Sequence, residues 1–162
     1  MPALRTDNTG EKHPKVECKL ATVAYMRQEL ERFFFAHWKE VGQDKAWEPE
    51  ANYPYYESLE RKNMLRIVVL LVDDQPAGYF LFLLGEALHY RGKLIAHSDM
   101  FYICPKHRAQ YAIRLFRAAE QYAKEAGAGK MYLSFKIYKD ITPLTKRLGF
   151  KPIETVVVKS LE

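Results

Sequence analysis

Two side chains that exchange protons readily, His97 and Asp99, lie two residues apart in Leu94–Cys104, whose composition predicts a strand. Because side chains alternate along a strand, both are expected on one face, together with Phe101 and Ile103. An imidazole takes up and releases a proton near neutral pH, which suits a general base. A carboxylate beside it could orient the ring, hold a water molecule or bind a cationic amine. The structural alternatives are a hydrogen-bonded sheet histidine and a capping or ion-paired carboxylate.

Positive charge collects in the C-terminal part of the chain. Residues 103–162 carry 12 Lys and Arg against 5 Asp and Glu, whereas residues 1–102 carry 13 against 15. A basic segment suits an anionic ligand, either a phosphorylated cofactor or nucleic acid, although a solvated lysine-rich face has the same composition. The segment lacks interleaved exposed aromatics and any known base-reading motif, so nucleic acid is the less favoured partner.

Composition also excludes several classes of protein. The 162 residues, 48% of them apolar, suffice for one domain with a core. No apolar run approaches the roughly 18 residues of a membrane span, so neither a signal peptide nor a membrane partner is expected. Two cysteines do not make a disulfide framework, which favours the cytoplasm. His89, Cys104 and His107 lack metal-ligand spacing, so no metal is predicted.

The elements that would position these side chains follow from hydrophobic periodicity. Strands are predicted at 16–20, 65–72, 77–84, 94–104, 131–138 and 153–158, and helices at about 22–41, 53–62, 109–126 and 142–148. Hairpins come first and a strand–helix–strand crossover last. This order predicts an α+β fold in which helices flank a mixed, mostly antiparallel twisted sheet. Residues 1–14 are expected to be a flexible lead-in, and residues 15–162 a single domain.

This order of elements, with a set of short motifs, resembles the GNAT acetyltransferases, and most closely the small acetyltransferase-like proteins of bacteriophage genomes. The resemblance covers roughly residues 20–160 and rests on the order and spacing of the motifs. It implies the acyl-CoA N-acyltransferase fold, acetyl-CoA as co-substrate, and transfer to a small amine or to a protein lysine or N-terminus. A phage-encoded member would act in the host cytoplasm. The motifs are His37-Trp38, Gly78-Tyr79, His89-Tyr90, Asp99–Arg108 (DMFYICPKHR) and Leu144–Pro152, which contains Leu148-Gly149-Phe150.

The resemblance assigns the cofactor to the predicted strand 94–104 and to the segment after it. The strand is expected to splay from its neighbour, so that backbone groups of Phe101, Tyr102 and Ile103 pair with the pantetheine arm. In the family a glycine-rich loop then presents N–H groups to the pyrophosphate at a helix N-terminus. Here Arg108 is kept but the glycines are absent. Either the backbone keeps the cradle and the loop tyrosine points outward, which we favour, or the tyrosine and isoleucine fill the site. The loop residues are Ala109, Gln110, Tyr111, Ala112 and Ile113.

The resemblance also implies roles in catalysis and acceptor binding. His97 and Asp99 fall where members carry two histidines or a glutamate. The tyrosine that usually protonates the leaving thiolate is replaced by Thr145, and Tyr138 and Tyr90 are candidate substitutes.

Two further sites carry open alternatives. His37 and Tyr90 are candidates for the acceptor pocket, although His37 also suits the core of the first helix. Lys139 is a candidate for the 3′-phosphate of the cofactor, although it also suits an exposed basic face.

Two functions therefore compete. The first is an acetyl-CoA-dependent N-acetyltransferase acting on a primary amine. The second is a catalytically degenerate relative that keeps the fold and binds a host or viral protein, because the substituted loop closes the cofactor site. The sequence does not name the acceptor, since acceptor pockets are built from variable loops. It also leaves open whether the chain is a monomer or a homodimer.

Overall fold

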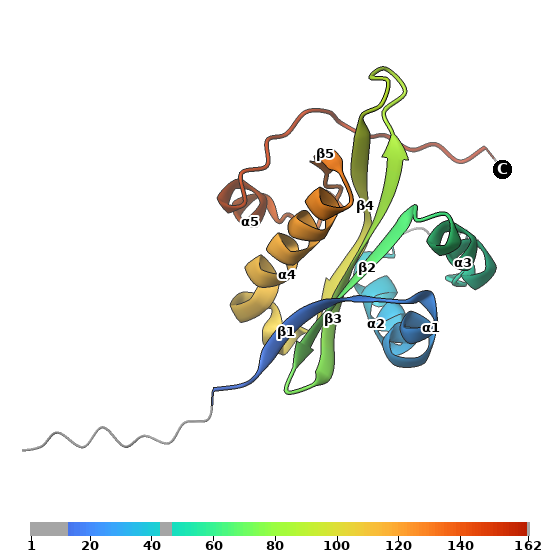
Figure 1. The fold of residues 1–162 in the computed structure, drawn as a ribbon. Coiled ribbons are helices and arrows are strands. Elements are labelled where there is room, and N and C mark those ends of the chain that lie inside the picture. The colour runs from blue at the N-terminus through green and yellow to red at the C-terminus, as the bar shows by residue number, and fades with distance from the viewer. Residues whose placement is uncertain (1–12, 43–46, 162) are drawn as a thin grey trace, which may run out of the picture.

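A five-stranded sheet forms the centre of the computed structural model, which describes residues 13–42 and 47–161. The strands follow the order β1-β2-β3-β4-β5, with antiparallel pairing as far as β4 and a parallel β5 (Figure 1). The predicted mixed, mostly antiparallel sheet is thus confirmed. The lead-in predicted at residues 1–14 lies outside the described residues, except for its last two. The strands are β1 (Val16–Ala21), β2 (Leu65–Val72), β3 (Gln75–Glu86), β4 (Leu94–Ile103) and β5 (Ala128–Tyr132).

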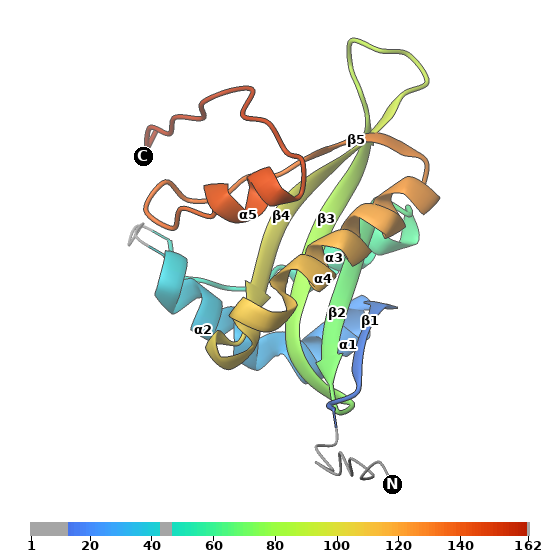
Figure 2. The ribbon, with the colours of Figure 1, turned by 90° about the vertical axis from the view of Figure 1, so that its left-hand side faces the viewer.

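Helices cover both faces of this sheet, as Figure 1 and Figure 2 show from two sides. Helices α1, α2 and α3 pack on one face, and α4 crosses the other, with α5 beside it. The predicted flanking arrangement is therefore confirmed. The helices are α1 (Val23–Tyr25), α2 (Glu31–Val41), α3 (Tyr53–Arg61), α4 (Pro105–Glu125) and α5 (Thr142–Arg147).

The first helical stretch contains a π-helical turn, Met26–Leu30, between α1 and α2. Thr22 caps the stretch, because its hydroxyl oxygen accepts a hydrogen bond of 3.1 Å from the backbone N–H of Tyr25. Met26 and Leu30 are fully buried, so the π turn lies against the sheet. The helix predicted from Thr22 to Val41 is confirmed in extent, but its periodicity did not predict the π turn.

The sheet is buried on both faces, which explains the unbroken apolar run of β2. Ile67 and Val69 pack with α1, α2 and α3, whereas Val68 and Leu70 pack on the side of α4. The two cores are thus separated by a single layer of backbone.

β4 carries one residue more than the strand opposite it. Leu81 of β3 pairs with Met100, but Phe82 pairs with Ser98, so Asp99 has no partner in the ladder. This is a β-bulge, which bends a strand and re-aims the side chains beside it.

The bulge changes which residues of β4 share a face. Ala96, Phe101 and Ile103 pack on the side of α4, whereas Tyr102 packs on the side of α1, α2 and α3. His97 follows Ala96 and so lies on the face opposite to Phe101 and Ile103. The prediction that these side chains share one face is therefore wrong, because the extra residue shifts the alternation.

The C-terminal part holds less strand than the sequence predicts. β5 ends at Tyr132, so most of the strand predicted at 131–138 is not formed. The strand predicted at 153–158 is also wrong, because residues 151–161 are exposed and hold no secondary structure. A strand requires a partner ladder, and in the described part of the chain none lies beside either segment. The predicted short helix at 142–148 is confirmed as α5.

Candidate functional site

β4 has β5 beside it only over the first part of its length. Their pairing runs from Leu94 to His97, which lies opposite Tyr132, and beyond that point the Ser134 backbone N–H donates to the Ser98 hydroxyl oxygen at 2.9 Å. The rest of β4 has β3 on one side and no strand on the other within residues 13–42 and 47–161. The predicted splay is thus present, and it leaves alternate backbone N–H and C=O groups free to pair with a ligand.

His97 lies where the two strands part. Its ring stacks on that of Tyr132, with centroids 4.6 Å apart and planes 11° apart. The imidazole is otherwise exposed, so it can reach a bound molecule. Tyr132 was missed by the sequence reasoning, because only the parallel register brings it opposite His97.

Asp99, the bulged residue, comes next along the strand. Asp99 is exposed to solvent, yet the protein around its carboxyl desolvates that group enough to raise its pKa. Burial also raises the pKa of Tyr56, and the charge of Asp99 raises it further. The carboxyl therefore lies near the tyrosines on the α3 side of the sheet.

An aromatic cluster lines the same face. The Tyr79 hydroxyl lies 2.8 Å from Nδ1 of His37, and the His37 ring lies 5.5 Å from that of Tyr102. Tyr79 is fully buried, and burial raises its pKa, with smaller effects from Tyr56, Tyr102 and Asp99. Burial lowers the pKa of His37. His37 thus lies within the cluster near the bulge. Tyr79 was missed as a site residue, although the Gly78-Tyr79 motif was an available signal.

The segment expected to be the pyrophosphate loop is helical. α4 begins at Pro105, so residues 108–113 lie within the helix and the N–H groups of 109–113 are used in its ladder. Tyr111 is buried and its ring lies 5.7 Å from that of His107. The favoured prediction that Tyr111 points outward is therefore wrong. Proline suits the first position of a helix, since it has no N–H to leave unpaired. With Pro105 in that position, α4 begins one turn before the predicted start at residue 109.

Arg108 joins three elements rather than standing free. Its Nε donates to the Ile103 carbonyl at 2.7 Å, and its Nη2 forms an ion pair of 2.5 Å with Glu40 of α2. The guanidinium also lies over the Tyr102 ring, 5.4 Å from its centroid. These contacts of Arg108 hold the end of β4 against α2 and against the start of α4.

The other predicted residues lie in different places. The Tyr138 hydroxyl donates to the Val41 carbonyl, which ties the segment after β5 to the end of α2. Lys139 is exposed in the turn that follows. Tyr90 lies at the tip of the β3–β4 hairpin, where Lys130 approaches its ring.

His37 and Tyr90, both predicted for the acceptor pocket, are not brought together. Tyr79, which holds His37, lies seven residues along β3 from Glu86 at the base of the hairpin. At the rise of a strand this is about 23 Å.

The described residues contain no group of three or more His, Cys, Asp or Glu side chains placed to hold a metal ion. Within residues 13–42 and 47–161, no helix combines the length and the apolar content needed to cross a membrane.

Comparisons with known proteins agree on one family. A model described as the acetyltransferase (GNAT) family matches residues 23–150. The search of curated protein sequences found no match.

Among solved structures, the fold is similar to a ribosomal-protein-alanine N-acetyltransferase from Brucella melitensis biovar Abortus 2308, with 17% identity, a TM-score of 0.68, and coverage of 90% of this chain and 99% of the other. It is also similar to glucosamine-6-phosphate N-acetyltransferase from Arabidopsis thaliana, with 8% identity, a TM-score of 0.68, and coverage of 91% and 99%. A third similar structure is AAC(6')-Iy in complex with the bisubstrate analog CoA-S-monomethyl-acetylneamine, with 14% identity, a TM-score of 0.65, and coverage of 91% and 99%.

Proposed function

Because the chain belongs to the GNAT acetyltransferase family, we propose that it transfers the acetyl group of acetyl-CoA to a primary amine of a small molecule or a protein. The observation that carries this proposal is the end of the pairing between β4 and β5, here called the fork, because the unpaired edge of β4 begins directly after His97. Acetyl-CoA supplies an activated thioester carbonyl when bound. The chain has to bind it, hold the amine and accept a proton.

The residues at the fork fit the cofactor in two places. The free edge of β4 at Phe101, Tyr102 and Ile103 can pair with the amide groups of a pantetheine arm, except for the Ile103 carbonyl, which already accepts a hydrogen bond from Arg108. At the N-terminus of α4, Pro105 has no N–H and the N–H groups of Cys104 and His107 donate to backbone carbonyls, so the N–H and the ammonium group of Lys106 are the donors for a pyrophosphate. These donors precede residues 109–113, so the absence of glycine from that segment does not remove them. Lys139 is our candidate for the 3′-phosphate.

The acceptor side is the face that carries Asp99. A carboxylate in a partly desolvated place attracts a cationic amine more strongly than one in bulk water. His97 then takes the proton from the ammonium group, which frees the lone pair that attacks the thioester carbonyl. The C–N bond forms as the C–S bond breaks, and CoA leaves as a thiolate that takes up the proton lost by the acylated nitrogen. Arg108 is a positioning residue, because it holds the Ile103 carbonyl and Glu40 rather than the reacting atoms.

The test is transfer of labelled acetyl from acetyl-CoA to a panel of primary amines. The similar structures suggest the panel: neamine, glucosamine 6-phosphate and a peptide with an N-terminal alanine. His97→Ala should lower kcat by about 10²- to 10⁴-fold, the usual contribution of a general base. Asp99→Asn should raise KM for the amine more than it lowers kcat. His89→Ala is the matched control, because His89 is an exposed histidine in the β3–β4 hairpin.

Isothermal titration with acetyl-CoA separates the outcomes. Retained binding in His97→Ala, with turnover lost, supports the assignment. Absence of acetyl-CoA binding to the unaltered chain at millimolar concentration would overturn it and favour the degenerate binding protein. A relation to bacteriophage-encoded members and a cytoplasmic location stay predictions from the sequence.

A further inference from the structure

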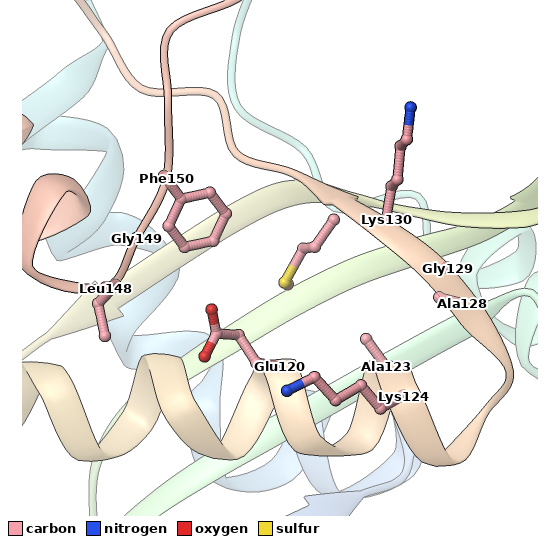
Figure 3. Close-up of a pocket in the computed structure, with 10 residues that line it drawn as sticks. Glu120, Ala123, Lys124, Ala128, Gly129, Lys130, Leu148, Gly149 and Phe150 are labelled. Atoms are coloured by element: carbon pink, nitrogen blue, oxygen red, sulfur yellow. The ribbon is translucent and has the colours of Figure 1, made fainter.

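Tyr132, the last residue of β5, shares a face of the sheet with His97. In the parallel pairing of β4 with β5, Tyr132 lies opposite His97, and Met131 lies opposite Ala96. Ala96 and Met131 pack on the side of α4, where Met131 lines the open groove between β5, α4 and the corner after α5 that Figure 3 shows. Because side chains alternate along a strand, Tyr132 and His97 both leave the sheet on the opposite face. This is the face of the acceptor side.

The two rings meet face to face. Their centroids are 4.6 Å apart and their planes 11° apart. The His97 side chain is exposed, whereas Tyr132 is half-buried, so the tyrosine is the better-packed member of the pair. A contact through the face of an imidazole leaves free the ring edge, which carries both nitrogens. The stack can therefore orient His97 without occupying the atoms that would take the proton.

The stack is also what orients this imidazole. Within residues 13–42 and 47–161, neither ring nitrogen of His97 has a hydrogen-bond or ion-pair partner. A histidine that acts as a base is commonly oriented by a hydrogen bond to its other ring nitrogen. The terminal torsion of a histidine side chain has broad wells, so an unheld ring would point its nitrogens in several directions. The Tyr132 ring thus takes the place of the hydrogen-bonding partner.

The backbone beside the stack keeps the two rings in register. β4 is paired there on both sides, since His97 lies opposite Leu83 of β3 as well as Tyr132 of β5. Just beyond, the Ser134 N–H donates to the Ser98 hydroxyl oxygen at 2.9 Å. This hydrogen bond holds the two strands together past the stack. The rings therefore lie at the closed end of the fork, where the positions of β4 and β5 are fixed.

We propose that Tyr132 is a positioning residue for acetyl transfer, whose ring holds the His97 imidazole with its nitrogen edge toward the amine on the acceptor side. The proposal rests on the proposed function, in which a proton passes from the ammonium nitrogen to an imidazole nitrogen. Tyr132 gives and takes no proton, so its hydroxyl is dispensable. The contribution of an aromatic pair corresponds to about 2- to 12-fold in the population of the held orientation.

Proton NMR of the imidazole C–H groups tests the contact without any substrate. A proton over the face of an aromatic ring is shifted upfield by the ring current. The His97 signals, identified by their loss in His97→Ala, should move downfield in Tyr132→Leu and stay in place in Tyr132→Phe. Unchanged His97 signals in Tyr132→Leu would overturn the proposal.

Steady-state kinetics with an accepted amine tests the role. Tyr132→Leu should lower kcat by about 2- to 12-fold and leave KM for the amine unchanged, whereas Tyr132→Phe should keep both. In a His97→Ala background, Tyr132→Leu should cause no further loss, because a positioning residue acts only through the residue that it holds. An equal loss of kcat in that background would show a merely structural role and would also refute the assignment.

Tyr122→Leu is the matched control. It removes a half-buried tyrosine from α4, on the other face of the sheet, and should keep kcat. Thermal melting checks that each variant stays folded. Absence of acetyl transfer to every amine would overturn both the proposed function and this role of Tyr132. Unchanged imidazole signals in Tyr132→Leu, with transfer intact in the unaltered chain, would overturn this role alone.

Discussion

Gly78 lies where the backbones of β3 and β4 leave no room for a side chain, and its replacement by alanine offers a sharp test of the sheet geometry. Gly78 pairs with Ile103, at the end of the proposed cofactor edge. A Cβ at this position would lie 2.5 Å from the Tyr102 carbonyl oxygen and 3.0 Å from the Ile103 Cα. Both are backbone atoms, so the two strands would have to separate.

The expected cost follows from two opposing effects. Overpacking of a dense interior costs about 1–3 kcal/mol, whereas alanine gains roughly 0.4–1 kcal/mol by restricting the unfolded chain. We expect Gly78→Ala to lower the free energy of unfolding by about 1–2 kcal/mol. With an m-value of about 2 kcal/mol/M in urea, the midpoint should fall by about 0.5–1 M.

Gly85 is the matched control, since it lies on the same strand and an added Cβ would meet nothing within 4 Å. Gly85→Ala should keep or raise the midpoint. If the two variants unfold at the same urea concentration, the close approach at Gly78 does not exist. Gly78→Ala should also weaken acetyl-CoA binding, because it moves the edge that binds the pantetheine arm.

Three further predictions concern single interactions. His37→Asn should reduce the loss of stability that occurs as the pH falls below 6.5. Burial lowers the pKa of His37 in the folded protein from 6.5, so the unfolded chain takes up the proton first and the free energy of unfolding drops as the pH falls toward the lower folded pKa. Urea unfolding between pH 7.5 and 5 measures this dependence. Tyr138→Phe removes the donor to the Val41 carbonyl and should cost about 0.5–1.5 kcal/mol in urea unfolding; a large loss of kcat without loss of stability would instead identify Tyr138 as the acid. Thr22→Ala should cost about 1 kcal/mol by removing the cap on Tyr25, as thermal melting can show, whereas Thr22→Ser should keep most of it.

The fold was predictable where the sequence pattern of a helix or strand depends only on its own residues. The apolar run Leu65–Val72 matches β2 in both bounds, since a strand buried on both faces needs no polar alternation. The helix 53–62 is confirmed to within one residue, with Asn52 as its cap. Such patterns are written in consecutive residues and need no knowledge of distant contacts.

Features that depend on a partner strand were not predictable in the same way. The bulge at Asp99 arises from the register with β3, and no residue type within β4 announces it. The segments 133–138 and 153–158 have strand-forming composition, but strand formation requires a ladder that the chain does not supply. The start of α4 was missed for another reason. Pro105 indicates a helix start, but the resemblance to the family predicted a loop at residues 108–113.

The candidate site was predictable in its residues more than in its geometry. The sequence singled out His97, Asp99 and His37, and the structure places Asp99 near the cluster that holds His37. The stacking of Tyr132 on His97 depends on the sheet register, and the contact between the buried Tyr79 hydroxyl and His37 depends on the packing of α2 on the sheet. Composition cannot show which face a residue occupies once a bulge intervenes.

The π turn at Met26–Leu30 holds one residue more than an α turn needs, so it is the place in the first helical stretch where chain length can change. Deleting one residue from this turn should convert it to an α turn, and Phe33 and His37 should then keep the faces on which they meet the sheet. The same deletion within α2 should rotate all later residues of that helix by about 100° and carry His37 away from Tyr79. Across related chains, a one-residue gap should therefore be more frequent within these five residues than within α2.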